Sequence, residues 1–140
     1  MFTQRIKEVM LSEPLLTAGR GTTVSEAARM MAERRQSAVV VLEAGRMVGI
    51  FTERDAVIRV IAAALDPRTT ELAQVMTPDP VTLGPEKSFG HALTLMHERG
   101  IRHVPVVEGD KVVGIVTARD ALDPDLEEFV CEAQRRQSLK

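Results

Sequence analysis

The sequence predicts an α/β (α+β) fold in which two β-α-β-β-α repeats are related by a pseudo-two-fold axis and a C-terminal helix follows. The segment at 49–55, Gly-Ile-Phe-Thr-Glu-Arg-Asp, returns 65 residues later at 114–120 as Gly-Ile-Val-Thr-Ala-Arg-Asp. Residues 22–55 align with 87–120 without a gap and are identical at 13 of 34 positions. A repeat of this length determines the architecture of the whole chain.

The duplication also predicts how the chain is divided. We expect a first repeat at 8–68, a second at 74–122 and a helical tail at 123–140. Repeats of roughly 60 residues are marginally stable alone, and no Gly/Ser-rich or Pro-rich spacer separates these two. The two repeats are therefore expected to pack on each other and share a core.

The first repeat begins with a short strand at Leu15-Leu16 and a helix over about 24–35. Thr23 and Glu26 match a capping box, in which each side chain satisfies a free N–H group at the start of a helix. Apolar residues at helical spacing then predict the buried face of this helix.

Two strands and a second helix complete the first repeat. Unbroken apolar runs at 38–42 and 47–51 are typical of buried strands, and the short turn at 43–46 predicts a hairpin between them. The second helix is expected to begin at Thr52. Its predicted apolar stripe consists of Ala56, Val57, Val60, Ile61, Ala64 and Leu65.

The second repeat follows the same order from a short strand at 80–83. Ser88 is the expected N-cap of its first helix, and Gly100 is placed to end that helix in a left-handed conformation. Apolar runs at 104–107 and 112–116 predict the second hairpin, with its turn at 108–111.

The tail begins with Asp123-Pro124, a helix start with Asp123 as N-cap and proline at the first helical position. An amphipathic helix is predicted by the spacing of Leu126, Phe129, Val130 and Ala133. This helix packs either on its own domain or on a partner subunit, and the sequence favours neither.

Composition argues against several classes of function. The net charge is -2 with both signs interspersed, so no positive field attracts nucleic acid, and the absence of Trp and Tyr removes the usual stacking platform for single strands. The N-terminal residues lack an apolar signal region, and no apolar stretch is long enough to span a membrane. We therefore expect a cytoplasmic protein without nucleic-acid or membrane partners.

Catalysis and metal binding are not expected either. Cys131 is the only cysteine, which excludes an internal disulfide and is most simply a surface thiol. His91, His97 and His103 have no spacing typical of a metal site, and no nucleophile with a base or pair of carboxylates is evident. The prediction is a chain that is not an enzyme and holds no metal or cofactor.

The repeated Thr-x-x-Asp segment allows two interpretations. As a capping box it only satisfies the first N–H groups of a helix. As a binding motif, its threonine hydroxyl and the helix N-terminus suit a phosphate, while the aspartate accepts hydrogen bonds from the two hydroxyls of a ribose. Gly49 and Gly114 favour the binding interpretation, because glycine lets a ligand approach the backbone closely.

With these features the chain resembles a pair of cystathionine-β-synthase (CBS) domains, the arrangement called a Bateman module. The resemblance rests on the duplicated Gly-Ile-x-Thr-x-Arg-Asp segments, on Arg-His-Val-Pro-Val-Val at 102–107, and on the Val-Met pairs at 9–10 and 75–76. It covers residues 8 to about 122. The resemblance implies adenosine-containing ligands in clefts between the repeats, most often AMP, ADP or ATP, and sometimes S-adenosylmethionine or NAD.

The resemblance also implies site residues. Thr52 and Thr117 would contact phosphate, and Asp55 and Asp120 would hold ribose hydroxyls. Arg102 and His103 occupy positions from which members of the family reach phosphate. Without the resemblance, Arg102 and His103 are interpreted as ordinary exposed residues at the start of a strand. Weaker candidates are Arg54, Arg119, Pro105, Thr82, Leu16 and Ala38.

The repeats differ where a phosphate would need a cation. The first repeat has Ser37, Ala38 and Val40 at the positions of Arg102, His103 and Pro105. The two clefts are therefore expected to differ in affinity.

The leading hypothesis is a non-catalytic regulatory sensor that binds an adenine nucleotide, with or without Mg²⁺, and acts on an unidentified protein. The second is a structural or interaction module in which the Thr-x-x-Asp segments are only helix caps. A nucleic-acid-binding protein is the third. The resemblance also implies a homodimer of CBS pairs, for which head-to-head and head-to-tail arrangements fit the sequence equally.

Overall fold

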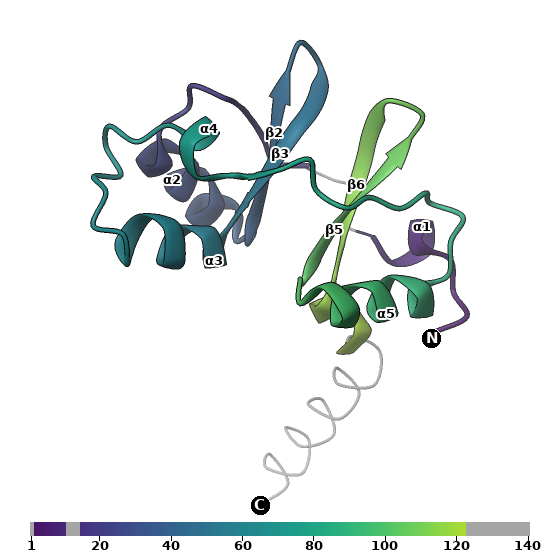
Figure 1. The fold of residues 1–140 in the computed structure, drawn as a ribbon. Helices are drawn as coiled ribbons and strands as arrows, with labels where there is room; N and C mark the ends of the chain where they lie inside the picture. Colours follow the sequence, from purple (N-terminus) through teal and green to yellow (C-terminus); the bar gives the residue numbers. More distant parts are fainter. Residues whose placement is uncertain (1, 11–14, 123–140) are drawn as a thin grey trace, which may run out of the picture.

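A computed structural model describes residues 2–10 and 15–122, so the predicted helix at 123–140 lies outside the described residues. Two similar halves stand next to each other, each with a strand hairpin and helices (Figure 1). The hairpins β2–β3 and β5–β6 lie side by side with their tips pointing the same way, and β3 contacts β6. The two-repeat α/β architecture is thus as predicted.

The first half contains a mixed four-stranded sheet with the order β1-β2-β3-β4. Strand β1 is parallel to β2, and the other neighbours are antiparallel. Its elements are β1 (Thr17–Gly19), α2 (Val24–Arg34), β2 (Ala38–Glu43), β3 (Arg46–Thr52), α3 (Glu53–Asp55), the π-helix η1 (Ala56–Ile61) and β4 (Thr77–Pro78).

The second half contains α5 (Phe89–Arg99), β5 (His103–Glu108), β6 (Lys111–Thr117) and the 3₁₀ helix η2 (Ala118–Leu122). Strands β5 and β6 form an antiparallel pair. The register shifts between Val106 and Val107, at the same repeat position as the shift between Val41 and Leu42 in the first hairpin. The duplication therefore preserves even the irregularity of the ladder.

Local sequence signals fix the ends of several elements as predicted. Thr23 caps α2 in a reciprocal capping box with Glu26, and the Ser88 hydroxyl accepts from the His91 N–H at the start of α5. Gly100 ends α5 in the left-handed conformation (φ 65°). Glycine adopts this conformation at no steric cost.

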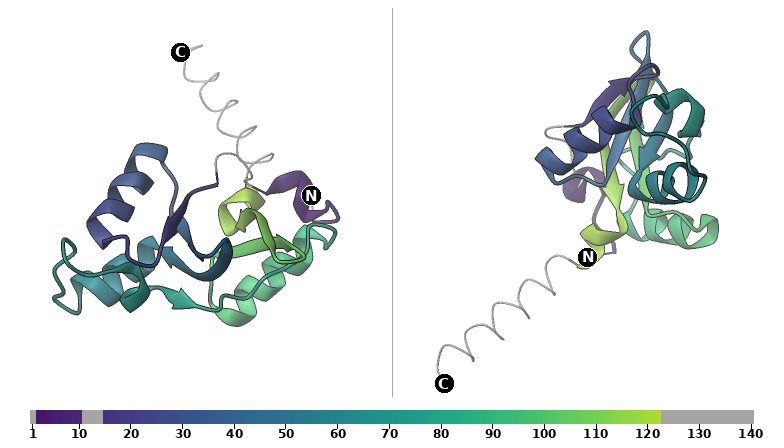
Figure 2. Two further views of the ribbon diagram at one scale, coloured as in Figure 1. Left: turned by 90° about the horizontal axis from the view of Figure 1, so that it is seen from above. Right: turned by 90° about the vertical axis from the view of Figure 1, so that its left-hand side faces the viewer.

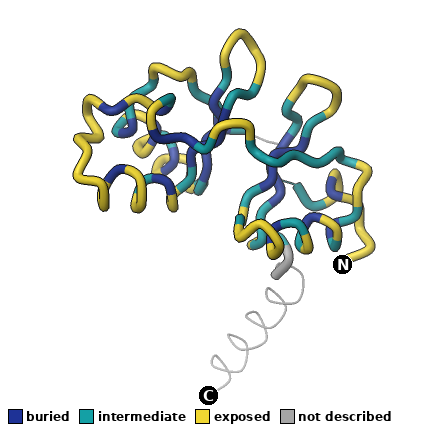
Figure 3. The backbone as a smooth tube through the Cα atoms, viewed as in Figure 1, coloured by how far each residue is buried: buried dark blue, intermediate teal, exposed yellow. Residues whose placement is uncertain are grey.

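Two predictions about secondary structure were wrong. The first strand covers 17–19 instead of 15–16, and at 80–83 only Leu83 forms a bridge, with Val106. The helix after Thr52 changes to a π-helix at Ala56. Of its predicted apolar stripe only Val60 is buried, whereas Val57, Ile61 and Leu65 are exposed. Figure 3 shows the helical segment that follows the first hairpin as largely exposed.

The two halves exchange short helices. Helix α1 (Ile6–Val9) lies at the N-terminal end of the first repeat but packs on the second half, where Ile6 is fully buried in one cluster with Phe89. Helix α4 (Leu72–Val75) lies at the start of the second repeat but packs on the first half, with Leu72 in its core. Figure 1 shows α1 next to α5 of the second half and α4 next to α2 of the first half, and the left view of Figure 2 shows the N-terminal helix beside the second half. This exchange makes each half depend on the other for its core.

A separate apolar cluster joins the halves. Ala38, Val40, Ile50 and Ile115 are buried together between the two hairpins. They come from β2, β3 and β6, so the two halves share a core, as the sequence predicted. This cluster positions the ends of the strands on which the candidate site residues lie.

Gly49 is required by packing, which differs from the role the sequence suggested. A Cβ atom at this position would collide with the Met76 side chain and lie 3.0 Å from the Thr77 carbonyl oxygen. Gly49 pairs with Pro78 of β4, so the space beside it is filled by the segment between the repeats and not by an open cleft.

We expect Gly49→Ala to destabilise the protein by about 1–3 kcal/mol, the usual cost of overpacking. The Met76 side chain can move, but the Thr77 carbonyl belongs to the backbone. Urea unfolding measures the effect. Gly19→Ala is the matched control, because nothing lies within 4 Å of a Cβ at Gly19; equal stability of the two variants would contradict this assignment.

Candidate functional site

The two Thr-x-x-Asp segments lie at the same end of the hairpins. Each follows the last strand of its repeat and is hydrogen-bonded to the residue before the neighbouring strand. The Glu53 N–H donates to the Ser37 carbonyl (3.1 Å), and the Ala118 N–H donates to the Arg102 carbonyl (3.0 Å). The structure therefore brings the predicted motif residues and the strand starts together in both repeats.

A hydrogen bond crosses from one repeat to the other at this end. The Ser37 Oγ and the His103 Nε2 lie 2.6 Å apart. The charges of Glu53 and Asp55 act on the His103 imidazole, so His103 of the second repeat faces the motif of the first. The sequence had left open which cleft His103 serves, and this contact places it beside the first motif.

Burial holds the pKa of His103 below its ordinary value of 6.5. The negative charge of Glu53 opposes this shift, the positive charge of Arg102 adds to it, and Asp55 opposes it more weakly. The imidazole is therefore mainly neutral at pH 7. A neutral imidazole can form a hydrogen bond with the Ser37 hydroxyl, but it does not supply a positive charge to a phosphate.

The lowered pKa of His103 predicts a loss of stability in mild acid. The unfolded chain takes up a proton near the ordinary value of 6.5, whereas the folded chain resists protonation. Stability is thus fully present above that value and falls as the pH drops through and below it. We expect His103→Gln to flatten the fall in melting temperature between pH 7.5 and 5.5, with exposed His91→Gln as control; an unchanged slope would contradict the assignment.

The first motif forms a complete capping box. The Asp55 N–H donates to the Thr52 hydroxyl (3.3 Å), and the Thr52 N–H donates to Asp55 Oδ2 (3.0 Å). The Thr52 hydroxyl also donates its own hydrogen to Asp55 Oδ2 (3.2 Å). The Thr52 hydroxyl is therefore used both as donor and as acceptor within the motif.

The second carboxylate oxygen of Asp55 contacts the segment between the repeats and the π-helix. Asp55 Oδ1 accepts from the Thr77 hydroxyl (3.3 Å) and lies 3.5 Å from Arg59 Nε. Arg59 also donates to the Met76 carbonyl (2.9 Å). Because Asp55 is only 7% exposed, its carboxylate lies inside a network of protein donors.

The second motif is built on the same plan but in a more open setting. The Thr117 N–H donates to Asp120 Oδ2 (2.9 Å), and Asp120 is half-buried. The residues that follow Thr117 form the 3₁₀ helix η2.

The weaker candidates divide by exposure. Leu16, Ala38 and Pro105 are buried in the core, where they shape the strands and present no surface to a ligand. Arg54 donates to the Gly100 carbonyl at the end of α5 (3.1 Å), so it joins the repeats. Thr82 is half-buried, and Arg119 is exposed.

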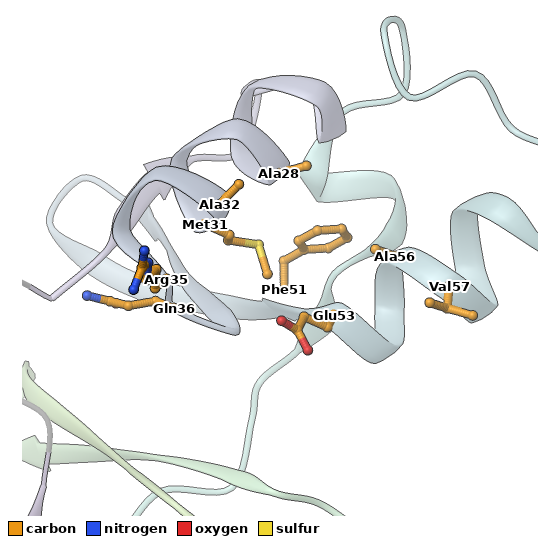
Figure 4. Close-up of a pocket in the computed structure, with 9 residues that line it drawn as sticks. All are labelled: Ala28, Met31, Ala32, Arg35, Gln36, Phe51, Glu53, Ala56 and Val57. Atoms are coloured by element: carbon orange, nitrogen blue, oxygen red, sulfur yellow. The ribbon is translucent and has the colours of Figure 1, made fainter. Parts of the chain in front are cut away.

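A groove lies on the outer side of the first half, between α2 and the α3–η1 segment (Figure 4). Its volume is about 490 Å³. The groove is lined by Ala28, Met31, Ala32, Arg35, Gln36, Phe51, Glu53, Ala56 and Val57. Its lining is mostly apolar, and none of its residues except Glu53 belongs to a Thr-x-x-Asp segment.

Two absences apply to residues 2–10 and 15–122. In this part of the chain no group of three or more His, Cys, Asp or Glu side chains is arranged to hold a metal ion. No helix there has the length and apolar character needed to cross a membrane.

Comparison with known families now adds to this geometry. The sequence profile of the CBS domain matches residues 6–61 and 72–126. The chain belongs to the CBS domain family. Each matched region begins with one of the exchanged helices, α1 or α4, so each sequence repeat starts on the opposite structural half.

Curated relatives of this CBS pair differ in length. YhcV of Bacillus subtilis is 32% identical over 115 residues, which cover 82% of this chain and 81% of YhcV. CBSCBSPB2 of Arabidopsis thaliana is 38% identical over 112 residues, which cover 79% of this chain but 21% of that protein. The chain thus spans about a fifth of this larger relative.

Solved structures show the same fold. An uncharacterized conserved protein from Pyrococcus horikoshii superposes with a TM-score of 0.83 at 32% identity, covering 89% of this chain and 94% of that one. The CBS domain pair of MJ0100, solved with 5-methylthioadenosine and S-adenosyl-L-methionine, has a TM-score of 0.75 at 26% identity (84% and 96% covered). A hexameric CBS-CP12 protein from cyanobacteria has a TM-score of 0.80 at 27% identity (96% and 83% covered).

Proposed function

We propose that this CBS pair is a non-catalytic sensor that binds an adenosine-containing ligand, AMP, ADP or ATP, between its two repeats. The observation that carries the proposal is the convergence of both motifs and both strand starts, joined by the Ser37–His103 hydrogen bond. A ligand seated there touches both repeats, so its binding changes how they are held together. The ligands of the MJ0100 pair, both adenosine derivatives, support this ligand class.

In this proposal the ligand contacts the second motif and the start of the neighbouring strand β5. Asp120 would accept the ribose hydroxyls, and Thr117 would contact phosphate. Arg102 is exposed, and its carbonyl accepts from the Ala118 N–H of the second motif. Arg102 is therefore the candidate cation for the phosphate. Arg102 is also the group that the first repeat replaces by Ser37.

Thermal melting with added nucleotide tests the proposal. A ligand that binds only the folded state stabilises it by about 2.7 kcal/mol at 100 times its dissociation constant. AMP, ADP, ATP, S-adenosylmethionine and NAD are compared at concentrations from micromolar to millimolar. A rise in melting temperature that saturates with one of them supports the sensor, and no shift with any of them contradicts it.

An interaction module without a nucleotide is the second candidate. It is favoured by the first motif, whose capping box is complete without any ligand, and by an exposed apolar face on η1. Val57, Ile58 and Ile61 are 55%, 52% and 71% exposed there. This face adjoins the groove of Figure 4 through Val57.

We expect a second CBS pair to cover this face, giving a homodimer. Light scattering should then show a mass of about twice 15.4 kDa at low micromolar concentration. Ile61→Asp should shift the protein toward the monomer, because a charge replaces an apolar contact. Phe2→Asp, at an exposed apolar residue outside this face, is the control. A 15.4 kDa species with and without nucleotide would exclude the dimer.

A further inference from the structure

The groove in the first half, shown in Figure 4, is lined by residues that the second repeat does not share. Phe51 contributes a fully buried aromatic ring to its apolar wall. Ala28 and Ala32 of α2 line it with a single methyl group each, whereas the second repeat has the larger Leu93 and His97 at these positions. The space in the groove therefore depends on side chains particular to the first repeat.

Only two of the lining residues are charged, and their charges are opposite. Figure 4 shows Arg35 at one end of the groove and Glu53 closer to Phe51. In the part of the chain that the structure describes, Arg35 and Glu53 form no ion pair with each other. The second repeat has Gly100 and Ala118 at their positions, so the fold of a repeat requires neither charge.

Arg35 has a backbone conformation that favours glycine. It ends α2 in the left-handed region with φ 53°, and its counterpart Gly100 ends α5 with φ 65°. A residue with a Cβ atom is less stable than glycine in this region, because the Cβ crowds the backbone. Strained positions of this kind are concentrated at functional sites. The first repeat thus carries a guanidinium group here at a cost in stability.

From the apolar wall and the two opposite charges we propose that the groove binds a free amino acid with an apolar side chain. The ligand carboxylate pairs with Arg35, its ammonium group pairs with Glu53, and its side chain lies against Phe51. An anion alone would leave Glu53 without a counter-charge, and a cation alone would do the same to Arg35. The volume of about 490 Å³ is within the range of small-molecule sites, roughly 300–1,000 Å³.

This groove is separate from the adenosine site proposed between the repeats, but one residue joins them. Glu53 begins α3, and its N–H donates to the Ser37 carbonyl (3.1 Å). The Ser37 Oγ lies 2.6 Å from the His103 Nε2 of the second repeat. An amino acid that pairs with Glu53 therefore acts next to the hydrogen bond that joins the repeats.

Chemical-shift mapping of the ¹⁵N-labelled full chain with L-leucine, L-methionine and L-phenylalanine tests the site. We expect saturable shifts of the amides at 28–36 and 51–57 with at least one of them, at a dissociation constant of about 0.1–1 mM. For leucine, 4-methylvalerate and isoamylamine each lack one of the two charges and should bind at least about tenfold more weakly.

Three outcomes of this titration would overturn the proposal. The first is the absence of shifts with all three amino acids up to about 10 mM, which is far above the expected dissociation constant. The second is equal binding of leucine and its two singly charged analogues. The third is a shift of the same amides with protein concentration but not with amino acid, which would assign the groove to contact with a second copy.

Two variants test the charges without endangering the fold, because each introduces the residue that the second repeat already uses. Arg35→Gly and Glu53→Ala should each weaken the bound amino acid at least about tenfold while melting cooperatively. Ala32→Leu, which fills the groove, should also abolish binding. Arg34→Gln is the matched control, since Arg34 is exposed one residue away and does not line the groove. Unchanged affinity in Arg35→Gly, or an equal loss in Arg34→Gln, would refute the site.

Discussion

Replacing Asp120 by alanine is expected to lower the affinity for AMP or ATP ten- to a hundredfold. A hydrogen bond to a charged group contributes roughly 1.5–3 kcal/mol, and about 1.4 kcal/mol corresponds to a factor of ten in affinity. Asp120 is half-buried, and its Oδ2 accepts from the Thr117 N–H. Calorimetric titration measures the change.

The ribose itself provides the control for this variant. If Asp120 accepts the 2′-hydroxyl, 2′-deoxy-AMP should bind the wild type more weakly than AMP, and Asp120→Ala should discriminate much less between the two. A variant that binds AMP as tightly as wild type, or that keeps the full preference for AMP, would show that Asp120 is only a helix cap.

Replacing Ile6 by alanine is expected to destabilise the protein by about 2–5 kcal/mol, the range for losing a large aliphatic side chain from a core. Ile6 is fully buried in the second half, although it lies at the start of the first repeat in the sequence. Its N–H also donates to the Lys87 carbonyl (2.8 Å). Urea unfolding measures the loss.

The repeat supplies a matched comparison for Ile6. Leu72 is its counterpart on α4 and is equally buried in the first half, so Leu72→Ala should cost a similar amount. Glu8→Ala, at an exposed position of α1, should change stability little. A cost below about 1 kcal/mol for Ile6→Ala would mean that α1 does not belong to the core of the second half.

The hairpins and the caps of α2 and α5 could be predicted because their signals are local. Thr23 with Glu26, and Gly100 after the last turn of α5, act on residues within one helical turn. The exchange of α1 and α4 could not be predicted. The recurring Val-Met pairs show that the two helices are equivalent, but they do not show on which half each packs, since that choice depends on contacts about 80 residues apart, such as Arg5 with Glu86.

The candidate site was predictable to a similar degree. The sequence identified Thr52 and Asp55 as either a capping box or a binding motif, and the contacts in the first repeat are those of the capping box. The Arg59 partner of Asp55 lies four residues along the helix, a spacing at which ion pairs are common. The Thr77 partner lies 22 residues away, beyond the reach of any local pattern.

The exposed face on η1 has a different cause. The apolar spacing predicted a helix with an apolar stripe. The structure instead forms a π-helix at Ala56–Ile61, which changes the angle between successive side chains and leaves Val57 and Ile61 outside the core. The predicted apolar residues are thus present on this helix, but among them only Val60 is buried within one chain.

Isothermal titration of the wild-type protein with AMP, ADP and ATP, and with S-adenosylmethionine and NAD alongside, tests the central claim that a ligand binds between the repeats. We expect saturable heat with at least one of the three adenine nucleotides, at about one ligand per chain. Replacing Arg102 by serine should then weaken AMP or ATP more than adenosine, because adenosine has no phosphate for the cation to contact. Flat titrations with all five ligands, from a protein that melts cooperatively, would contradict the claim and leave an interaction module as the function of this CBS pair.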